Sequence, residues 1–180
     1  MLTPARAPAQ KWTAISRGVL GPKSDPVDAL AKLAVVLRVV QTTMVALFAH
    51  KHTEGGVVGV LRSTHPLLGL AALAVFAFGQ ALNAGIYHAI GKNGVYYGVK
   101  LGKTIPWATG FPFNVCGHPQ YVGCVLTLWG AFAPAIANGP AWLALLPGLW
   151  SLFYVFSGIV ESDGSKGAVP AMNTRKKLKK

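Results

Sequence analysis

The chain has 180 residues, of which 52% are hydrophobic and only 12% are charged. Soluble domains carry about 25% charged residues, so this composition, with a mean hydropathy of +0.44, excludes a single water-soluble core. The net charge of +12 is also typical of nucleic-acid-binding proteins, but the apolar content favours anionic lipid as the partner, and we expect no nucleic acid.

The acidic residues limit the available chemistry. Only five are present, and none lies between Glu54 and Glu161. Too few carboxylates remain for a Mg²⁺ or Ca²⁺ site or for a paired-carboxylate hydrolase. The two cysteines, Cys116 and Cys124, do not make a disulfide framework, and we interpret them as free thiols.

Residues 1–28 form a basic segment with four prolines. No apolar core follows its early charges, so it does not resemble a signal peptide; its low acid content gives a weak likeness to a transit peptide. We predict a tail that is disordered or lies on the membrane surface, where Trp12 and Ile15 would anchor it.

Residues 29–49 and 66–90 are the first two long apolar segments, and each is long enough to cross a bilayer. Arg38 and Gln41 lie three residues apart on one face of the first, so they must face protein or water. Polar and aromatic side chains form a stripe on the second, which predicts either pocket lining or contacts between helices. The stripe consists of Phe76, Gln80, Asn83 and Tyr87.

Residues 50–65, between these segments, are expected to form a loop. His50, His52 and His65 lie there, but a zinc site needs firmer spacing and usually a Cys or carboxylate partner. We therefore interpret them as exposed loop histidines and predict no metal.

Residues 91–110 break the apolar pattern with recurring glycines and lysines. The spacing fits neither a Walker nor a Rossmann loop. It predicts a short interfacial helix, with Trp107 at the depth of the headgroups.

The stretch from Phe111 to Gly123, FPFNVCGHPQYVG, holds the densest set of special residues in the chain. Apolar segments follow at 121–137 and 141–160, the second with an expected kink at Pro147. A stripe on this last segment leads to Glu161, after which residues 162–180 form a basic tail that we expect to be disordered on the membrane surface.

Lysine and arginine counts predict the topology. Four spans would place the N-terminal tail, the middle loop and the C-terminal tail on one side, with four, three and six basic residues. The opposite loops hold Lys51 and Arg62 and then none. The positive-inside rule therefore puts the central stretch and Glu161 in the cytosol, and the terminal lysines give weak support for the endoplasmic reticulum.

Between residues 66 and 163 the chain resembles a phospholipid N-methyltransferase of the type that methylates phosphatidyl-N-methylethanolamine. The pieces that carry the resemblance are FGQALN, GVYYG, FPFNV, PQYVG and the final Glu161, in this order. The HPxYxG part alone also resembles the isoprenylcysteine carboxyl methyltransferases. The resemblance implies S-adenosylmethionine as the methyl donor and a phospholipid within the bilayer as the substrate.

The resemblance also implies a donor site. A GxG falls on Ala77-Phe78-Gly79, where the first glycine is Ala, and a Glu-Glu pair falls on Glu161-Ser162, where the second glutamate is Ser. Gly79 permits close approach of the donor, and Glu161 suits its ammonium or ribose diol. Further donor-binding candidates follow in the central stretch: Pro119, Tyr121 and Gly123.

Methyl transfer to an amine requires that the amine lose its proton. His118 is the candidate base, because an imidazole titrates near neutral pH. Related proteins often have Asn at this position, and capping of the helix that begins at Pro119 is an equal alternative. Lys100 and Lys103 are candidates for the lipid phosphate, or else they snorkel at the interface.

Aromatic residues near the central stretch suit the quaternary ammonium product, or else form an ordinary interfacial belt. The candidates are Trp107, Phe111, Phe113 and Tyr121, with Phe113 assigned to the substrate.

We therefore predict an all-α integral membrane bundle of about four helices with an interfacial segment and basic disordered tails. Residues 29–161 form the methyltransferase domain between tails 1–28 and 162–180. The predicted function is methylation of phosphatidyl-N-methylethanolamine to the dimethyl form and phosphatidylcholine in the endoplasmic reticulum, with a mitochondrial or plastid membrane as the alternative.

Two other classes compete with this function. A prenyl-protein carboxyl methyltransferase would need an Arg-rich carboxylate site, and Gly117 stands where that family has Arg. A non-enzymatic membrane scaffold leaves the stripes that hold Gln80 and Glu161 without a purpose.

Overall fold

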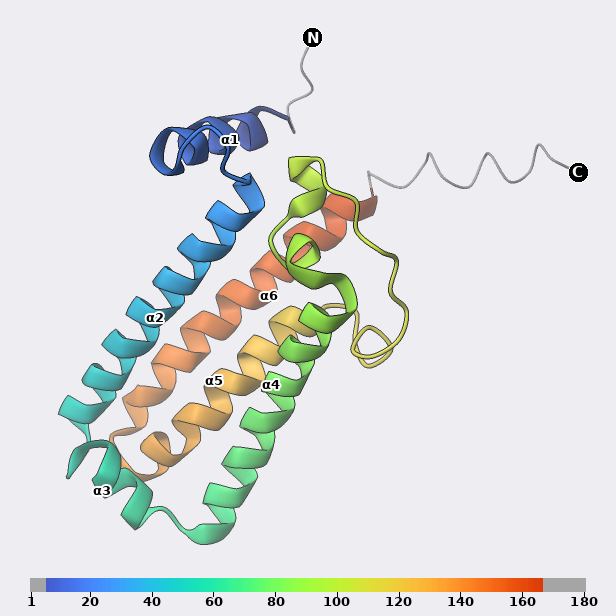
Figure 1. Cartoon of the computed structure of the whole chain (residues 1–180). Coiled ribbons are helices and arrows are strands. Elements are labelled where there is room, and N and C mark those ends of the chain that lie inside the picture. The colour runs from blue at the N-terminus through green and yellow to red at the C-terminus, as the bar shows by residue number, and fades with distance from the viewer. Residues whose placement is uncertain (1–5, 167–180) are drawn as a thin grey trace, which may run out of the picture.

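The structure, a computed structural model, describes the backbone of residues 6–166 and the side chains of residues 8–159. This part of the chain is helical, without a strand (Figure 1). Its elements are α1 (Arg6–Leu20), α2 (Pro26–His52), α3 (Gly56–Ser63), α4 (Pro66–Val95), η1 (Gly98–Leu101), α5 (Pro119–Asn138), η2 (Ala141–Ala144) and α6 (Leu145–Lys166).

Four stretches of the described chain are long and apolar enough to cross a membrane: Pro26–His52, Pro66–Leu101, Pro119–Asn138 and Ala141–Ile159. Large apolar side chains remain exposed along them, such as Val36 on α2, Leu73 on α4 and Phe156 on α6, which is 66% exposed. So much apolar surface is compatible with lipid but not with water. The predicted all-α membrane bundle is confirmed.

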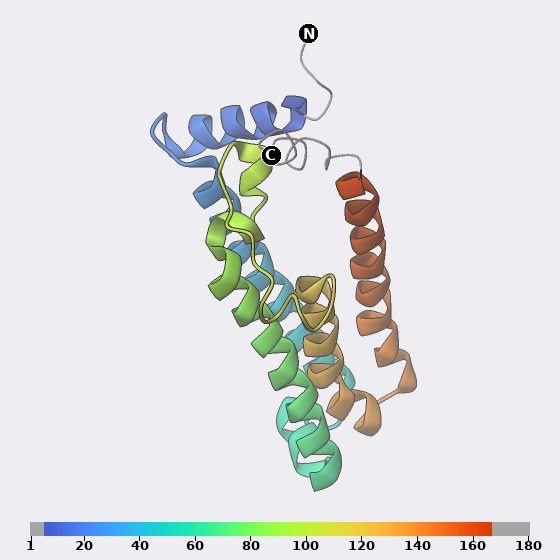
Figure 2. The same ribbon diagram turned by 90° about the vertical axis from the view of Figure 1, so that its right-hand side faces the viewer.

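The spanning helices run side by side, and α5 lies between α4 and α6 (Figures 1 and 2). α1 lies across the end of the bundle where α2 begins, and the segment that follows α4 and the end of α6 are found at this same end. α3 lies at the opposite end. Both views also show that α5 begins well below the end of α6, part of the way down the bundle.

Small residues bring α4 and α5 close together. A Cβ atom at Gly79 would lie 2.7 Å from the Gly123 carbonyl oxygen, and one at Gly130 would lie 2.6 Å from the Phe76 amide nitrogen. Small-residue contacts of this kind allow membrane helices to pack backbone to backbone. Gln80 Nε2 donates to Thr127 Oγ1 across the same interface at 3.2 Å, so this part of the polar stripe holds two helices together.

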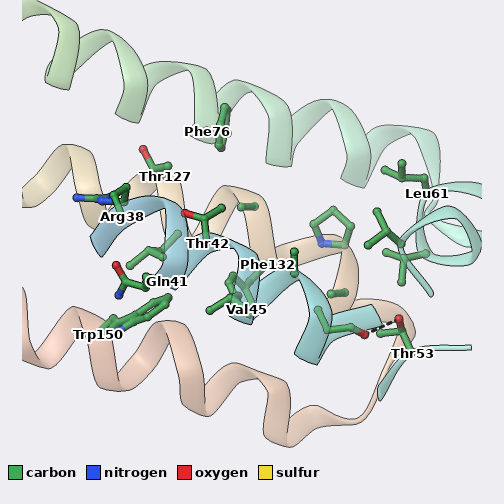
Figure 3. Close-up of a pocket in the computed structure, with 18 of the residues that line it drawn as sticks. Arg38, Gln41, Thr42, Val45, Thr53, Leu61, Phe76, Thr127, Phe132 and Trp150 are labelled. Atoms are coloured by element: carbon green, nitrogen blue, oxygen red, sulfur yellow. Dashed lines mark hydrogen bonds between the residues drawn. The ribbon is translucent and has the colours of Figure 1, made fainter. Parts of the chain in front are cut away.

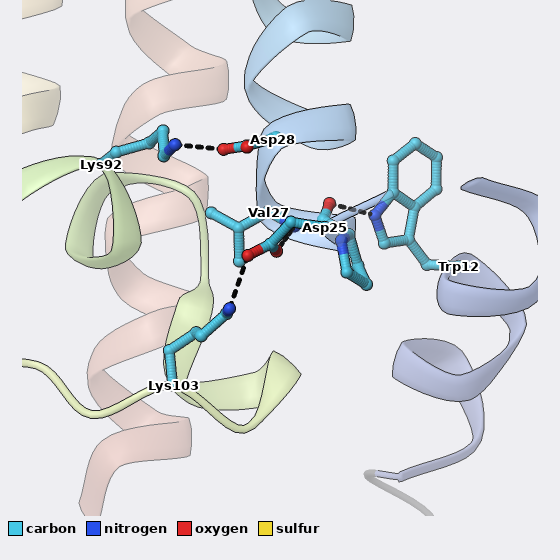
Figure 4. Close-up of polar contacts among 7 residues, drawn as sticks. Trp12, Asp25, Val27, Asp28, Lys92 and Lys103 are labelled. Atoms are coloured by element: carbon cyan, nitrogen blue, oxygen red, sulfur yellow. Dashed lines mark hydrogen bonds and ion pairs between the residues drawn. The ribbon is translucent and has the colours of Figure 1, made fainter. Parts of the chain in front are cut away.

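Ion pairs and a capping carboxylate fix the start of α2 (Figure 4). Asp25 Oδ1 accepts from the Val27 amide at 2.9 Å, and Asp25 Oδ2 lies 2.5 Å from Lys103 Nζ. Asp28 pairs with Lys92, and Trp12 Nε1 donates to the Pro26 carbonyl at 2.9 Å. The hydrogen bond from Lys103 lowers the pKa of Asp25 below its ordinary value of 3.8. These contacts tie α1 and the segment after α4 to α2.

The N-terminal segment is helical from Arg6 to Leu20, so the disordered alternative does not hold there. Ile15 and Val19 leave an apolar face exposed, Val19 by 77%, while Arg17 lies on another face. This amphipathic pattern, on a helix that lies across the end of the bundle, fits the surface-lying alternative. The predicted disorder of the C-terminal tail falls largely on residues 167–180, outside the described residues.

The prediction of a loop at 50–65 was wrong, because α2 continues to His52 and α3 occupies Gly56–Ser63. Gly55 and Gly56 both have positive φ, which reverses the chain after α2. The valines and leucine that follow then recur with helical spacing, and Val60 is buried.

Of the short interfacial helix predicted within 91–110, the structure shows the four-residue η1. α4 continues to Val95 through Gly91, whose φ of 62° lies outside the helical region, and η1 then gives way to irregular chain. Tyr97 and Gly102, both with positive φ, flank η1 and prevent a longer helix.

Pro147 does not have to kink α6, as was predicted, because it falls in the first turn of that helix. There its missing N–H leaves no helical hydrogen bond unmade.

Candidate active site

A pocket of about 390 Å³ opens between the first half of α5 and the last part of α6. His118 and Tyr121 reach it from α5, and Tyr154 and Gly158 reach it from α6. The remaining lining is apolar: Val122, Val125, Leu126, Val155 and Ile159. Glu161 follows Ile159 by two residues in α6, and its side chain, like that of Ser162, lies outside the described residues.

Three rings follow one another along the pocket. The centroids of His118 and Tyr121 are 6.1 Å apart with an interplanar angle of 32°, and those of Tyr121 and Tyr154 are 6.0 Å apart at 37°. Aromatic faces attract cations such as sulfonium and ammonium groups. The pocket therefore suits a positively charged ligand in an apolar surrounding.

The start of α5 places His118 at the pocket. His118 occupies the N-cap position and Pro119 the first helical position, but the imidazole makes no capping hydrogen bond. Instead, the His118 carbonyl accepts from the amides of Tyr121 and Val122 at 3.1 and 3.2 Å. Since the exposed ring is not used for capping, it remains available for chemistry in the pocket.

The glycines predicted for donor binding lie away from this lining. Gly79 and Gly123 are buried in the α4–α5 interface, where a Cβ on Gly123 would lie 2.9 Å from Asn83 Oδ1. Ala77 and Phe78 are exposed on α4, and Pro119 is buried at the start of α5. In the structure the two glycines set the spacing of helices, and their contact with a donor stays a prediction.

The residues predicted for the substrate do not line this pocket either. Lys100 Nζ lies 4.8 Å from the centroid of the Tyr97 ring, and Lys103 is paired with Asp25. Phe113 is half-buried, whereas Trp107 is 93% exposed. Because Lys103 already has a carboxylate partner, Lys100 is the better candidate of the two for a phosphate.

Sequence reasoning did not assign Arg38 and Tyr154 to a site, although both stood on polar stripes. Arg38 Nη2 lies 3.9 Å from Cys124 Sγ, which in turn lies 3.9 Å from Asn83 Oδ1. Tyr154 lines the pocket described above. Within the described residues, no three His, Cys, Asp or Glu side chains come together as metal ligands.

This geometry defines a class: an integral membrane protein with a largely apolar pocket between two of its spanning helices, into which a histidine and two tyrosines project. The profile of the phospholipid methyltransferase family matches residues 68–163. The chain belongs to this family.

Two relatives agree with the family match. Phosphatidyl-N-methylethanolamine N-methyltransferase of Arabidopsis thaliana is 36% identical over 165 residues, which are 89% of this chain and 83% of the relative. The protein of the same name from Emericella nidulans is 37% identical over 85 residues, 47% of this chain and 41% of that protein. No solved structure matches the chain.

The family confirms the predicted class of enzyme, a phospholipid methyltransferase, and neither the scaffold nor the prenyl-protein alternative is favoured. Membership also implies S-adenosylmethionine as the methyl donor.

Proposed function

We propose that this chain transfers methyl groups from S-adenosylmethionine to the headgroup amine of phosphatidyl-N-methylethanolamine, giving the dimethyl form and then phosphatidylcholine. One observation carries the proposal: the α5–α6 pocket brings His118 and Tyr121 to the part of α6 that leads to Glu161. The names of the two relatives support this choice of substrate.

The pocket fits the donor in size and chemistry. Ligand pockets typically measure about 300–1,000 Å³, which includes the 390 Å³ found here. Tyr121 and Tyr154 offer ring faces to a sulfonium, and the carboxylate of Glu161 is the candidate acceptor for the ammonium or the ribose diol of the donor. Ser162 and the Ala77-Phe78-Gly79 turn of α4 are further candidates for this donor.

The bound donor supplies a methyl group that is activated by a positively charged sulfur. The substrate nitrogen forms a bond to this carbon while the carbon–sulfur bond breaks, and the electron pair goes to sulfur. The residues of the chain have to align these atoms and exclude water. Val122, Val125 and Val155 line the pocket with apolar surface that would exclude water, and α5 begins part of the way down the bundle (Figure 2).

His118 handles the proton in this scheme. The amine attacks only when neutral, and an imidazole nitrogen of His118 takes its proton. The ring makes no capping hydrogen bond, so this use does not compete with a structural one. Lys100 and Phe113, in the segment above the pocket, are the candidates to meet the headgroup as it enters.

The chain is an integral membrane protein, and we propose that the pocket opens toward the cytosol in the endoplasmic reticulum. The support is the charge distribution: residues 1–28, 91–110 and 162–180 hold four, three and six basic residues, against two in residues 50–65. A mitochondrial or plastid membrane remains the alternative.

Incubation of the purified protein with labelled donor and a lipid panel tests the function. The panel holds phosphatidylethanolamine, its monomethyl and dimethyl forms, and a prenylated cysteine peptide. We expect label in the products of the monomethyl and dimethyl lipids. Label on the prenylated peptide alone, with donor binding intact, would overturn the proposal.

A further inference from the structure

A second cavity, of about 330 Å³, lies among α2, α3, α5 and α6 and is closed on one side by Phe76 of α4 (Figure 3). Arg38, Gln41 and Thr127 lie together at one end of it, and Thr53 and Leu61 lie at the other. Arg38 and Thr53 are 15 residues apart, so the cavity follows α2 for about 22 Å at 1.5 Å per residue. That is more than the ~15 Å that an acyl chain spans in one leaflet of a bilayer.

The middle and far end of this cavity are apolar. Aliphatic and aromatic side chains line them, among them Val45, Ala49, Val60 and Phe132. The cavity is not sealed, because Val57 and Leu61 at its far end are exposed, Leu61 by 67%. A hydrocarbon chain therefore has both a matching wall and a way in from the lipid side.

Arg38 supplies the only charge among the residues that line this cavity. Its guanidinium has five N–H donors, and its neutral neighbours are the weak acceptor Cys124 Sγ, at 3.9 Å, and the side chain of Tyr154. In residues 8–159 the ion pairs are those of Lys92 with Asp28 and Lys103 with Asp25, and neither involves Arg38. An arginine within a spanning helix is costly, so it is by default a candidate for a functional site, and an anion is the ligand that would neutralise it. Its planar fork matches a phosphate in particular.

Tyr154 connects this cavity to the candidate active site, because it lines both. Arg38 lies beside Cys124, which follows His118 by six residues in α5, about 9 Å farther from the start of that helix. From the start of α5 downward, the order is thus base, guanidinium and apolar cavity. A phospholipid has the same order: amine, phosphate and acyl chain.

We propose that Arg38 binds the phosphate of the substrate phospholipid and that the cavity beyond it holds one of the acyl chains. This inference rests on the proposed function and adds a determinant of lipid recognition to it. With phosphate and chain held, the amine is directed toward His118.

The first test measures acyl-chain preference. Ala49→Phe and Val45→Phe each fill the cavity, whereas Ala74→Phe places the same ring on an exposed part of α4 outside both pockets. Methylation is measured with monomethyl-ethanolamine lipids whose chains run from octanoyl to oleoyl. The two cavity variants should shift the preferred chain several-fold toward short lipids, and Ala74→Phe should not. Because the ratio of two lipids is measured within one variant, partial misfolding does not affect it. An unchanged ratio in both cavity variants would overturn the acyl-chain site.

The second test separates the lipid from the donor. Arg38→Gln should raise KM for the lipid by roughly tenfold or more, and Arg38→Lys by less, with Kd for S-adenosylmethionine unchanged. A weakened donor Kd with an unchanged lipid KM would assign Arg38 to the donor carboxylate instead and contradict the proposal.

A binding assay keeps this inference distinct from the proposed function. Trp150 lines the cavity, and its contribution to the tryptophan fluorescence is the part that Trp150→Phe removes. Phosphatidyl-N-methylethanolamine with brominated acyl chains should quench this part. Arg38→Gln should abolish this quenching at low lipid concentration. Such quenching without any methylation would refute the proposed function and retain the lipid site. Methylation without such quenching would refute the lipid site and retain the proposed function.

Discussion

Replacement of Gly79 by alanine tests the close packing of α4 against α5. The added Cβ would lie 2.7 Å from three atoms of α5: the Gly123 carbonyl oxygen and the amide nitrogen and Oγ1 of Thr127. Two of these are backbone atoms, which cannot rotate away. To restore ordinary contact, α4 and α5 have to separate by about 0.7 Å.

The cost follows from this geometry. Overpacking costs about 1–3 kcal/mol, and we expect the upper part of this range because the neighbours are backbone atoms. The higher helix propensity of alanine offsets about 0.5–1 kcal/mol of this loss of stability. The net loss is therefore about 1–2 kcal/mol, which for a chain of this size lowers Tm by roughly 2–8 °C.

Thermal unfolding in detergent, followed with a thiol-reactive dye, measures this loss. Cys124 is 5% exposed and lies next to Gly123, so the dye reports separation of α4 from α5 in a Cys116→Ser background. Gly69→Ala on the same helix is the matched control, since its nearest atom would be 3.9 Å away, and its Tm should stay level or rise. A Gly79→Ala protein as stable as the Gly69→Ala protein would refute the close packing. If Gly79 also contacts the donor, the Gly79→Ala protein should bind the donor more weakly even at temperatures well below its Tm.

Three further predictions concern single side chains. His118→Asn should leave Tm unchanged, lower kcat by about 10²–10⁴ and remove the acid limb of the pH profile, because the ring takes the substrate proton; an unaltered pH profile would exclude that role. Glu161→Gln should weaken S-adenosylmethionine binding by about tenfold or more in calorimetry, and equal Kd values would remove Glu161 from the donor site. Lys103 lowers the pKa of Asp25, so the ion pair stabilises the fold above about pH 4 and is lost as pH falls through the lowered pKa. The Tm advantage of wild type over Asp25→Asn should therefore correspond to at most about 1 kcal/mol at pH 6. It should be lost as pH falls below 3.8 and through the lowered pKa, while Asp25→Ala should lose the helix cap as well. A Tm difference that does not change with pH would show that the pair contributes nothing.

Hydropathy was sufficient to predict the four spans, because lipid requires long apolar segments whatever their partners. The helices α1 and α3 were missed for a common reason. Glycines, prolines and charges surround both helices and obscure their spacing, and each helix is also held by contacts from outside it or by burial: Trp12 donates to the Pro26 carbonyl, and Val60 is buried. Glycine-rich chain after residue 91 looked helical by composition, but positive φ at Gly91 and Gly102 interrupts it.

The site was predictable only where a motif carried it. His118 and Tyr121 lie three residues apart and come together through one helix turn, whereas their partner Tyr154 comes from α6 through helix packing. For Arg38 the sequence indicated only that the side chain avoids lipid. Which helix it faces depends on how α2 packs against α5, and periodicity within one helix does not report that.

The central claim is that the α5–α6 pocket is the methyl-transfer site, and filling it tests this most directly. A Cβ at Gly158 would lie 3.5 Å from the Tyr121 ring, so Gly158→Leu extends into the pocket without a backbone clash. Gly148→Leu, on the same helix with no atom within 4 Å of its Cβ, is the control. The measurement is the Kd for S-adenosylmethionine of both purified variants. We predict at least tenfold weaker binding for Gly158→Leu and an unchanged Kd for Gly148→Leu; equal, wild-type affinities in both would contradict the claim.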